Sequence, residues 1–337
     1  FRNLLTALCA TSIFLVGCGA KPPESKDVKA PESANVDSPA VSAPAEAPKT
    51  SESTEAPASA EQPKEAESAG AAPEETLIEV EALYTLPAAG SPSEKLTVEE
   101  IKAFLADPKN NEPLKLKSPL GLEDVNAVIP ADNPLTKAKV ELGRMLYFDK
   151  RLSRDESVSC ASCHDPAFGW AQDTPVAAGI EGQKGNRNSP TVMNRAFGKT
   201  QFWDGRAATL EEQALGPIQN PIEMGFTLPE LLNRLKGIEG YQLFFDKVFG
   251  GEVTAENIAK AIASFERTVL VGAAPNDYYT QAERFLKMSP EELDELEPED
   301  KARAERIMAE YKAHPLSEAA LRGRDLYFNK AKCSLCH

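Results

Sequence analysis

The chain has 337 residues and carries 52 acidic against 37 basic side chains, so its formal net charge is −15. This balance and the absence of a basic stripe exclude nucleic acid as a partner. Residues 19–75 contain five Lys against twelve Asp or Glu, so roughly half of the net negative charge says nothing about a folded surface.

The N-terminal segment has the pattern of a secretory signal. Its apolar run, residues 4–16, is broken only by small polar residues and ends shortly before Cys18. A membrane span needs about 20 apolar residues, so residues 1–18 are predicted to be a signal peptide with a lipobox rather than a span or a buried helix. Cys18 would then carry lipid and anchor the protein to a membrane in the periplasm. Because Gly19 rather than Asp follows Cys18, we expect the outer membrane rather than the inner one.

Two segments precede the first globular region. Residues 19–75 are dominated by Ala, Pro, Glu and Ser and contain no aromatic side chain. Such a composition cannot bury enough apolar surface to offset chain entropy, so we expect a disordered tether. Residues 76–129 form an N-terminal extension, in which Thr97 and Glu100 fit a capping box at the start of a short helix.

The segment 130–272 has a globular balance of apolar and polar residues, with few strand signals. Its most periodic helix is predicted over 257–271, where four apolar residues recur every three to four positions and are expected to be core. These residues are Ile258, Ile262, Phe265 and Val269. Residues 273–320 are rich in charge and are predicted to form an exposed helical insertion. We therefore expect a mainly α fold.

Two Cys-x-x-Cys-His pentads are the most informative feature of the sequence. They comprise Cys160, Cys163 and His164, and then Cys333, Cys336 and His337. Covalent attachment of a c-type haem requires this spacing, because two thiols one helical turn apart add to the porphyrin vinyl groups and the following imidazole ligates the iron. A zinc site would need four converging ligands, and a redox disulfide would need no adjacent His. Two covalently bound haem c groups are therefore predicted.

A near-copy of one phrase precedes each pentad, at residues 143–150 and again at 323–330. The repetition predicts two haem-binding units, the first of them over 130–272. His337 is both the expected iron ligand of the second unit and the last residue of the sequence. We therefore expect residues 321–337 to be the start of a second haem domain that is truncated in this fragment.

Five further segments between the pentads carry a resemblance to a known family. They are residues 183–191, 201–207, 212–217, 223–224 and 265–268. With them, the sequence resembles the bacterial di-haem cytochrome c peroxidase family from residue 130 to 268, and again from residue 321. The resemblance implies two cytochrome c-like haem domains, of which the first is peroxidatic and the second receives electrons.

The resemblance also implies roles for individual residues. His164 is the proximal ligand of the peroxidatic iron, while Gln213 and Glu223 lie on its distal side, where Gln213 orients peroxide and Glu223 moves the proton that allows water to leave. Trp203 corresponds to a tryptophan between the two haems that helps electrons to pass. Asn188 corresponds to a residue that helps to bind a calcium ion. Without the resemblance, Glu223 would be interpreted as a solvated or capping carboxylate, and Trp203 as a core residue.

One position departs from the family pattern. Many members carry a distal His in the loop before residue 183, which caps the iron of the oxidised enzyme until reduction releases it. Ile180 stands at the matching position, and its aliphatic side chain has no lone pair for iron. We therefore expect the oxidised protein to be open to peroxide without reductive activation.

These features predict a lipid-anchored periplasmic peroxidase that reduces hydrogen peroxide to water. Electrons would come from a small cytochrome c or a copper protein and pass through the second haem; the family pattern also admits a homodimer. Two alternatives remain open. One is a MauG-type di-haem oxidase, which matures a tryptophan-derived quinone in a partner protein. The other is a non-catalytic di-haem electron carrier, which would have no use for Gln213 and Glu223.

Overall fold

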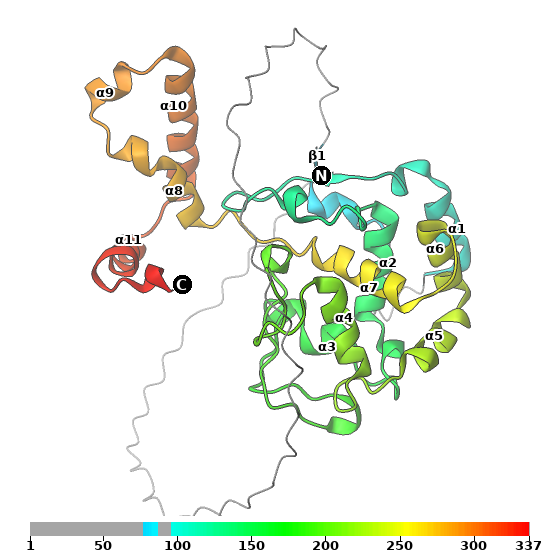
Figure 1. Cartoon of the computed structure of the whole chain (residues 1–337). Helices are drawn as coiled ribbons and strands as arrows, with labels where there is room; N and C mark the ends of the chain where they lie inside the picture. Colours follow the sequence, from blue (N-terminus) through cyan, green and yellow to red (C-terminus); the bar gives the residue numbers. More distant parts are fainter. Residues whose placement is uncertain (1–76, 87–95, 337) are drawn as a thin grey trace, which may run out of the picture. The chain divides into compact units, whose positions relative to one another are not determined.

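The computed structural model describes residues 77–86 and 96–336, which all lie in the second of two compact units, residues 69–337. The predicted signal peptide and tether, together with Cys18 and His337, lie outside the described residues. The described part of the chain is mainly helical, as expected (Figure 1). None of its helices combines the length and the hydrophobicity that a membrane span requires.

The elements follow one another as short strands, helices and long loops. The strands are β1 (Leu77–Ile78) and β2 (Lys115–Leu116), which pair in parallel. The α-helices are α1 (Val98–Ala106), α2 (Lys137–Phe148), α3 (Cys160–Cys163), α4 (Leu210–Gln219), α5 (Leu228–Lys236), α6 (Glu239–Phe249), α7 (Ala255–Glu266), α8 (Pro275–Leu286), α9 (Pro290–Asp294), α10 (Pro298–Ala313) and α11 (Glu318–Asp325). Short 3₁₀ helices are η1 (Val80–Leu83), η2 (Pro108–Asn110), η3 (Val125–Val128), η4 (Lys150–Leu152), η5 (Pro166–Phe168), η6 (Ile180–Gly182), η7 (Arg195–Phe197) and η9 (Cys333–Leu335), while η8 (Leu326–Lys330) is a π-helix.

The predicted N-terminal helix is confirmed as α1, and its start follows the capping rule. The Glu100 N–H donates to Thr97 Oγ1 at 3.2 Å, and the Thr97 N–H donates to Glu100 Oε2 at 2.7 Å. These two bonds satisfy backbone donors that the start of a helix leaves without intrahelical partners. The apolar face of α1 packs on α6, where the ring centroids of Phe104 and Phe244 lie 6.1 Å apart.

Helices α2 and α7 form the centre of the core, and they lie side by side in Figure 1. Gly143 of α2 allows this close approach, because a Cβ at Gly143 would stand 1.9 Å from the Ala261 carbonyl oxygen of α7. On α7, the side chains of Ile258, Ile262 and Phe265 are all buried. The prediction that this apolar stripe is core is therefore confirmed.

Helix α7 is shorter than predicted, since it ends at Glu266 rather than at residue 271. Thr268 gives the physical reason, because its hydroxyl donates to the Phe265 carbonyl oxygen at 2.6 Å. A threonine that bonds to the backbone in this way competes with the helical hydrogen bonds. Val269 stays buried even so, which means that the periodic pattern detected burial beyond the end of the helix.

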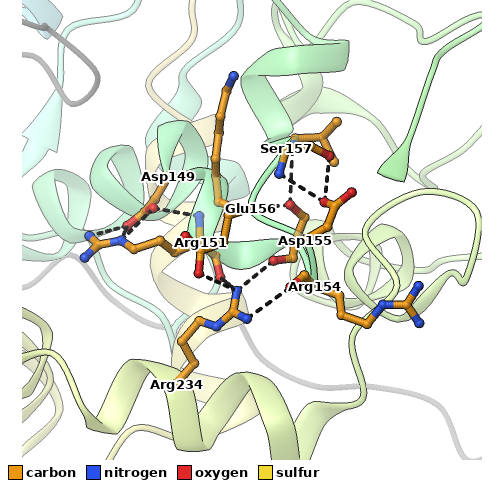
Figure 2. A network of polar contacts seen from close by, with 10 residues as sticks. Asp149, Arg151, Arg154, Asp155, Glu156, Ser157 and Arg234 are labelled. Atoms are coloured by element: carbon orange, nitrogen blue, oxygen red, sulfur yellow. Dashed lines mark hydrogen bonds and ion pairs between the residues drawn. The ribbon is translucent and has the colours of Figure 1, made fainter. Parts of the chain in front are cut away.

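One arginine of α5 holds the loop between α2 and α3 (Figure 2). Arg234 Nη1 donates to the carbonyl oxygens of Arg151 and Ser153 at 3.1 and 2.8 Å, and Nη2 donates to that of Arg154 at 3.0 Å. A planar guanidinium can reach several acceptors at once in a fixed geometry. Because α3 begins at Cys160, shortly after this loop, Arg234 fixes the chain that leads into the first pentad.

The charged stretch 273–320 is helical, as predicted. Helices α8 and α10 pack on each other, with the rings of Tyr279 and Tyr311 in edge-to-face contact at 5.6 Å between centroids. His314 follows α10 and stacks on Tyr278, with 4.3 Å between the ring centroids.

Candidate haem-attachment site

The first pentad begins as a single helical turn, α3, on which both cysteines are free thiols. A side-chain cap defines its start, because the Ser159 N–H donates to Ser162 Oγ at 2.9 Å. Residues three apart on a helix face the same side, so Cys160 and Cys163 present their sulfur atoms together. Attachment of one porphyrin through two thioether bonds needs this arrangement.

A main-chain carbonyl holds the ring of His164. Its Nδ1 lies 2.9 Å from the Pro190 carbonyl oxygen, so Nδ1 carries a hydrogen and donates it, since a carbonyl can only accept. The neutral ring then has its lone pair on Nε2, as a metal-ligating imidazole requires. Burial lowers the pKa of His164, although hydrogen bonds to main-chain carbonyls oppose this effect. A lowered pKa favours the neutral ring, which fits an axial haem ligand.

Four aromatic side chains beside the pentad form an apolar wall. They are Tyr147, Phe148, Trp170 and Phe265, with ring centroids 5.1–6.2 Å apart. Tyr147 connects this wall to the pentad, because its hydroxyl donates to the His164 carbonyl oxygen at 3.5 Å. Tilted and edge-to-face aromatic contacts of this kind bury a large apolar area in a defined geometry. Tyr147 and Phe265 are fully buried in this wall, whereas Phe148 and Trp170 are partly exposed, so the last two can offer apolar contacts to a porphyrin.

Glu266, the last residue of α7, is a buried carboxyl whose Oε2 has no hydrogen-bond partner among the described residues. Burial raises the pKa of Glu266 to about 8, so the carboxyl is neutral at neutral pH and carries a hydrogen that it can donate. The pKa of the Cys160 thiol is raised mainly by burial and secondly by the negative charge of Glu266. Glu266 therefore lies close to the first attachment cysteine. An unpartnered buried oxygen beside a free thiol fits a set of residues that surrounds a haem.

The buried Glu266 carboxyl predicts a pH dependence of stability. Its pKa of about 8 in the folded protein lies above the ordinary value of 4.5, so between these values the folded protein holds a proton that the unfolded chain has lost. The free energy of unfolding should therefore fall as pH rises through this interval, by on the order of a few kcal/mol. Glu266→Gln removes the titrating group, so its stability relative to the wild type should increase with pH.

Urea unfolding of the haem-loaded proteins at several pH values measures this difference. Glu256→Gln is the matched control, because it replaces an exposed carboxylate of the same helix; it should keep the pH dependence of the wild type. A difference between Glu266→Gln and wild type that stays constant from about pH 5 to about pH 9 would contradict the prediction.

Glu223 lies in the turn that follows α4, and its side chain is half-buried. The Asn220 amide donates to Glu223 Oε1 at 2.9 Å. Burial raises the pKa of Glu223, while the Arg206 charge and the Asn220 hydrogen bond oppose this effect. The pKa of Cys163 is raised mainly by burial and secondly by the negative charge of Glu223. Glu223 is therefore a neighbour of the attachment helix. Gln213 lies half-buried on α4, the helix that leads to this turn.

Ile180 is a packing residue in this structure. Its side chain is fully buried, and its Cδ1 would lie 2.3 Å from a Cβ on Gly225, whose φ of +68° also favours glycine. The Ile180 N–H donates to the Glu223 carbonyl oxygen at 2.9 Å. The loop that carries Ile180 is therefore docked, through both side chain and backbone, on the turn that carries Glu223.

Trp203 is 88% exposed, so the interpretation of this residue as core is wrong. It lies in a short loop that is closed by an antiparallel bridge between Gln201 and Ala207. The Arg206 guanidinium stacks over the Phe202 ring, 3.4 Å from the ring centroid, and adds a cation–π contact inside this loop. The loop thus presents the indole outwards instead of burying it.

Asn188 makes a local contact, since its Nδ2 donates to the Thr174 carbonyl oxygen at 2.8 Å. In the part of the chain that the structure describes, no group of three or more His, Cys, Asp or Glu side chains converges as a metal site would require. The calcium ion therefore stays a prediction that depends on Asn188 and on the resemblance.

The second pentad lies in a different setting from the first. Cys333 and Cys336 are exposed, and the predicted iron ligand His337 is outside the described residues. In the repeated phrase, Gly323 has no atom within 4 Å of an added Cβ, whereas its counterpart Gly143 lies against α7. Within the described ranges, the two copies share a sequence pattern but not a packing environment.

Sequence reasoning assigned no role to three contributors to the site, namely Pro190, Asn220 and Glu266, although Pro190 and Glu266 lie in segments that carry the resemblance. The Asn-Pro dipeptide at 220–221 is a turn signal that points to Asn220. Pro190 acts through its main-chain oxygen, and Glu266 through the burial that α2 and α7 create together. Neither property has a signature in the local sequence.

Comparison with known proteins finds relatives over part of the chain. The chain is 36% identical over 211 residues to the methylamine utilization protein MauG of Methylophilus methylotrophus. The matched region covers 62% of this chain and 54% of that protein. The chain is 44% identical over 154 residues to the cytochrome c551 peroxidase of Pseudomonas aeruginosa, or 44% of each protein. A crystal structure of a MauG-like protein associated with microbial copper homeostasis is similar with a TM-score of 0.50 and 29% identity, over 69% of this chain and 57% of that one. The chain spans about half the length of the first two curated relatives it matches.

The paired thiols of α3, the oriented imidazole of His164 and the mainly helical fold fit a c-type haem protein. Residues 137–284 match the family model described as di-haem cytochrome c peroxidase. This part of the chain is therefore similar to the di-haem cytochrome c peroxidases, and the similarity points to c-type haems as the cofactors.

Proposed function

We propose that this protein reduces hydrogen peroxide to water at a c-type haem attached to Cys160 and Cys163, with His164 as the proximal ligand. The observation that carries the proposal is Glu223, a half-buried carboxylate in the turn after α4 that accepts a hydrogen bond from Asn220 at 2.9 Å. When bound, the haem supplies the redox chemistry that cleaves the O–O bond. The chain supplies orientation, proton transfer and an apolar surrounding.

Glu223 is proposed to act as the general base and then as the general acid. Burial raises the pKa of Glu223, which brings the protonated and ionised carboxyl closer in free energy at neutral pH and suits proton transfer in both directions. The carboxylate accepts the proton of the inner peroxide oxygen and returns it to the outer oxygen, which leaves as water. Gln213, on the helix before this turn, orients the peroxide through its side-chain amide.

The overall reaction consumes two electrons and two protons for each peroxide and yields two water molecules. We propose that a small cytochrome c or a copper protein supplies these electrons through a second haem, held by the pentad of Cys333, Cys336 and His337. The exposed indole of Trp203 supports a role between the two haems, because an aromatic group that its own loop leaves uncovered can contact a further group. We further propose that the protein binds a calcium ion at Asn188 and forms a homodimer.

The resting state of the protein is also part of the proposal. Ile180 is aliphatic, and its buried side chain packs against Gly225. These two facts support the proposal that this loop provides no protein ligand on the distal side of the iron. The oxidised protein should therefore react with peroxide without prior reduction.

The experiment uses the haem-loaded protein, oxidised with ferricyanide and freed of oxidant, mixed with hydrogen peroxide in a stopped-flow spectrometer. We expect a haem absorbance change without a reductant, a high-spin ferric signal by electron paramagnetic resonance, and then oxidation of two molecules of reduced cytochrome c for each peroxide. A wholly low-spin protein that is inert until one electron is added would contradict the open resting state. Peroxide consumption that oxidises no donor would contradict the peroxidase function.

A second candidate is a MauG-type oxidase that acts on a partner protein. The observation in its favour is the 36–38% identity to two methylamine utilization proteins MauG. Its signature would be peroxide consumption that leaves reduced cytochrome c untouched and oxidises aromatic side chains of a partner. A non-catalytic electron carrier would show neither reaction.

The signal pattern before Cys18 supports a lipid-anchored protein in the periplasm, at the outer membrane. Fractionation of cells that express the chain with Cys18 or with Cys18→Ser would test this location, since only the former should stay with the membranes.

A further inference from the structure

Asn220 joins the helix that carries Gln213 to the turn that carries Glu223. As the C-terminal cap of α4, its N–H donates to the carbonyl oxygens of Gly216 and Pro217 at 3.1 and 3.2 Å. Its own carbonyl oxygen accepts from the Glu223 N–H at 3.0 Å. The main chain of Asn220 therefore sets the path of the turn on both sides.

The side chain of Asn220 uses both ends of its amide. Oδ1 accepts from the Ile222 N–H at 3.1 Å, and Nδ2 donates to Glu223 Oε1 at 2.9 Å. The Ile222 N–H can only donate, so the amide oxygen must face it and the NH₂ group must face the carboxylate. Only a side chain with one acceptor and one donor at this spacing can make both contacts.

Other groups around Glu223 act on its carboxylate from a distance or through the backbone. Arg206 contributes a positive charge and Cys163 of α3 is the neighbouring thiol. Ile180 contacts the same turn through its N–H, which binds the Glu223 carbonyl oxygen rather than its carboxylate. Among the described residues, Asn220 is thus the hydrogen-bond donor to the carboxylate itself.

We propose that Asn220 is a positioning residue for Glu223, which holds the carboxylate at the haem-attachment site through its side-chain amide. This inference rests on the proposed role of Glu223 in peroxide reduction. A carboxylate held by one fixed donor keeps the orientation that proton transfer requires, whereas a free carboxylate rotates among several orientations.

Asn220→Asp tests the inference because it changes the hydrogen-bonding character of the side chain and keeps its shape. An acceptor then replaces the donor opposite Glu223 Oε1, and two like charges face each other. We expect peroxide turnover to fall by about 10- to 100-fold, while the infrared carboxyl band that Glu223→Gln abolishes should titrate about 1 pH unit higher or more. Gln219→Ala is the matched control, because the neighbouring Gln219 is exposed and its side chain donates only to Leu215 of its own helix; both measurements should match the wild type.

A rescue variant keeps the test decisive if Asn220→Asp folds poorly. In the double variant Asn220→Asp with Glu223→Gln, the donor and the acceptor exchange places, so the hydrogen bond can form again. Urea unfolding should show that the double variant is closer to the wild type in midpoint than Asn220→Asp alone, which is a coupling that a double-mutant cycle isolates. This measurement needs no activity.

The outcomes separate the inference from the proposed function. If Asn220→Asp keeps both the titration of the Glu223 band and the turnover of the wild type, while Glu223→Gln is inactive, then Asn220 does not position Glu223 and the peroxidase role stands. If Glu223→Gln retains full turnover, the proposed function of Glu223 fails, and the infrared titration and the rescue still decide whether Asn220 holds the carboxylate. Additive effects in the double variant would overturn the inference.

Discussion

Glu223→Gln should lower peroxide turnover by about 10²–10⁴-fold, the range that a general acid–base group contributes. The substitution conserves shape, and the new side-chain oxygen can still accept the hydrogen bond that Asn220 donates at 2.9 Å to Glu223 Oε1. It removes the capacity to take up and release a proton. The loss should therefore appear in turnover, with the covalent haem content and the absorption spectrum of the oxidised protein unchanged.

Glu181→Gln provides the control for this measurement. Glu181 is an exposed carboxylate in the loop that docks on the Glu223 turn, and it pairs with Arg154 at 3.1 Å. Exposed ion pairs contribute little to stability, so this variant should retain the turnover of the wild type. Steady-state oxidation of reduced cytochrome c by peroxide measures both variants. Turnover of Glu223→Gln within a few-fold of wild type would remove Glu223 from the mechanism.

Gly143→Ala should destabilise the folded chain by about 3 kcal/mol. The added Cβ would stand 1.9 Å from the Ala261 carbonyl oxygen and 2.9 Å from Phe265 Cβ. The first of these contacts is with the backbone of α7, which cannot rotate away as a flexible side chain can. Helices α2 and α7 must therefore separate, and Phe265 and Glu266 would move with α7 away from the first pentad.

Gly323→Ala is the matched control in the chain of 337 residues. Gly323 occupies the same place in the repeated phrase, but nothing lies within 4 Å of an added Cβ. Alanine favours a helix by about 1 kcal/mol over glycine, so this variant should be as stable as the wild type or slightly more stable. Urea unfolding of the two haem-loaded variants gives the comparison. Equal stabilities would show that α2 and α7 do not depend on a glycine at their crossing.

Local patterns in the sequence predicted local structure well. Thr97 and Glu100 predicted the start of α1, because a capping box involves atoms only three residues apart. The stripe of Ile258, Ile262 and Phe265 predicted a buried helix face, because helical periodicity reports burial directly. The end of α7 was missed, since it depends on where the Thr268 hydroxyl donates.

The sequence by itself determined the chemistry of attachment. Two thiols one turn apart and followed by His164 predict a c-type haem from the sequence alone, because the attachment residues lie within a single helical turn. The family resemblance likewise depends on short contiguous segments that can be recognised from the sequence alone.

Only the tertiary structure decided which groups surround that site. The Pro190 carbonyl that orients His164, the donor from Asn220 to Glu223 and the unpartnered carboxyl of Glu266 all depend on atoms brought together by packing. Burial and hydrogen bonding then set the protonation of these groups, and both are properties of the assembled environment rather than of the residue type. For the same reason, the exposure of Trp203 followed from its loop and not from its aromatic character.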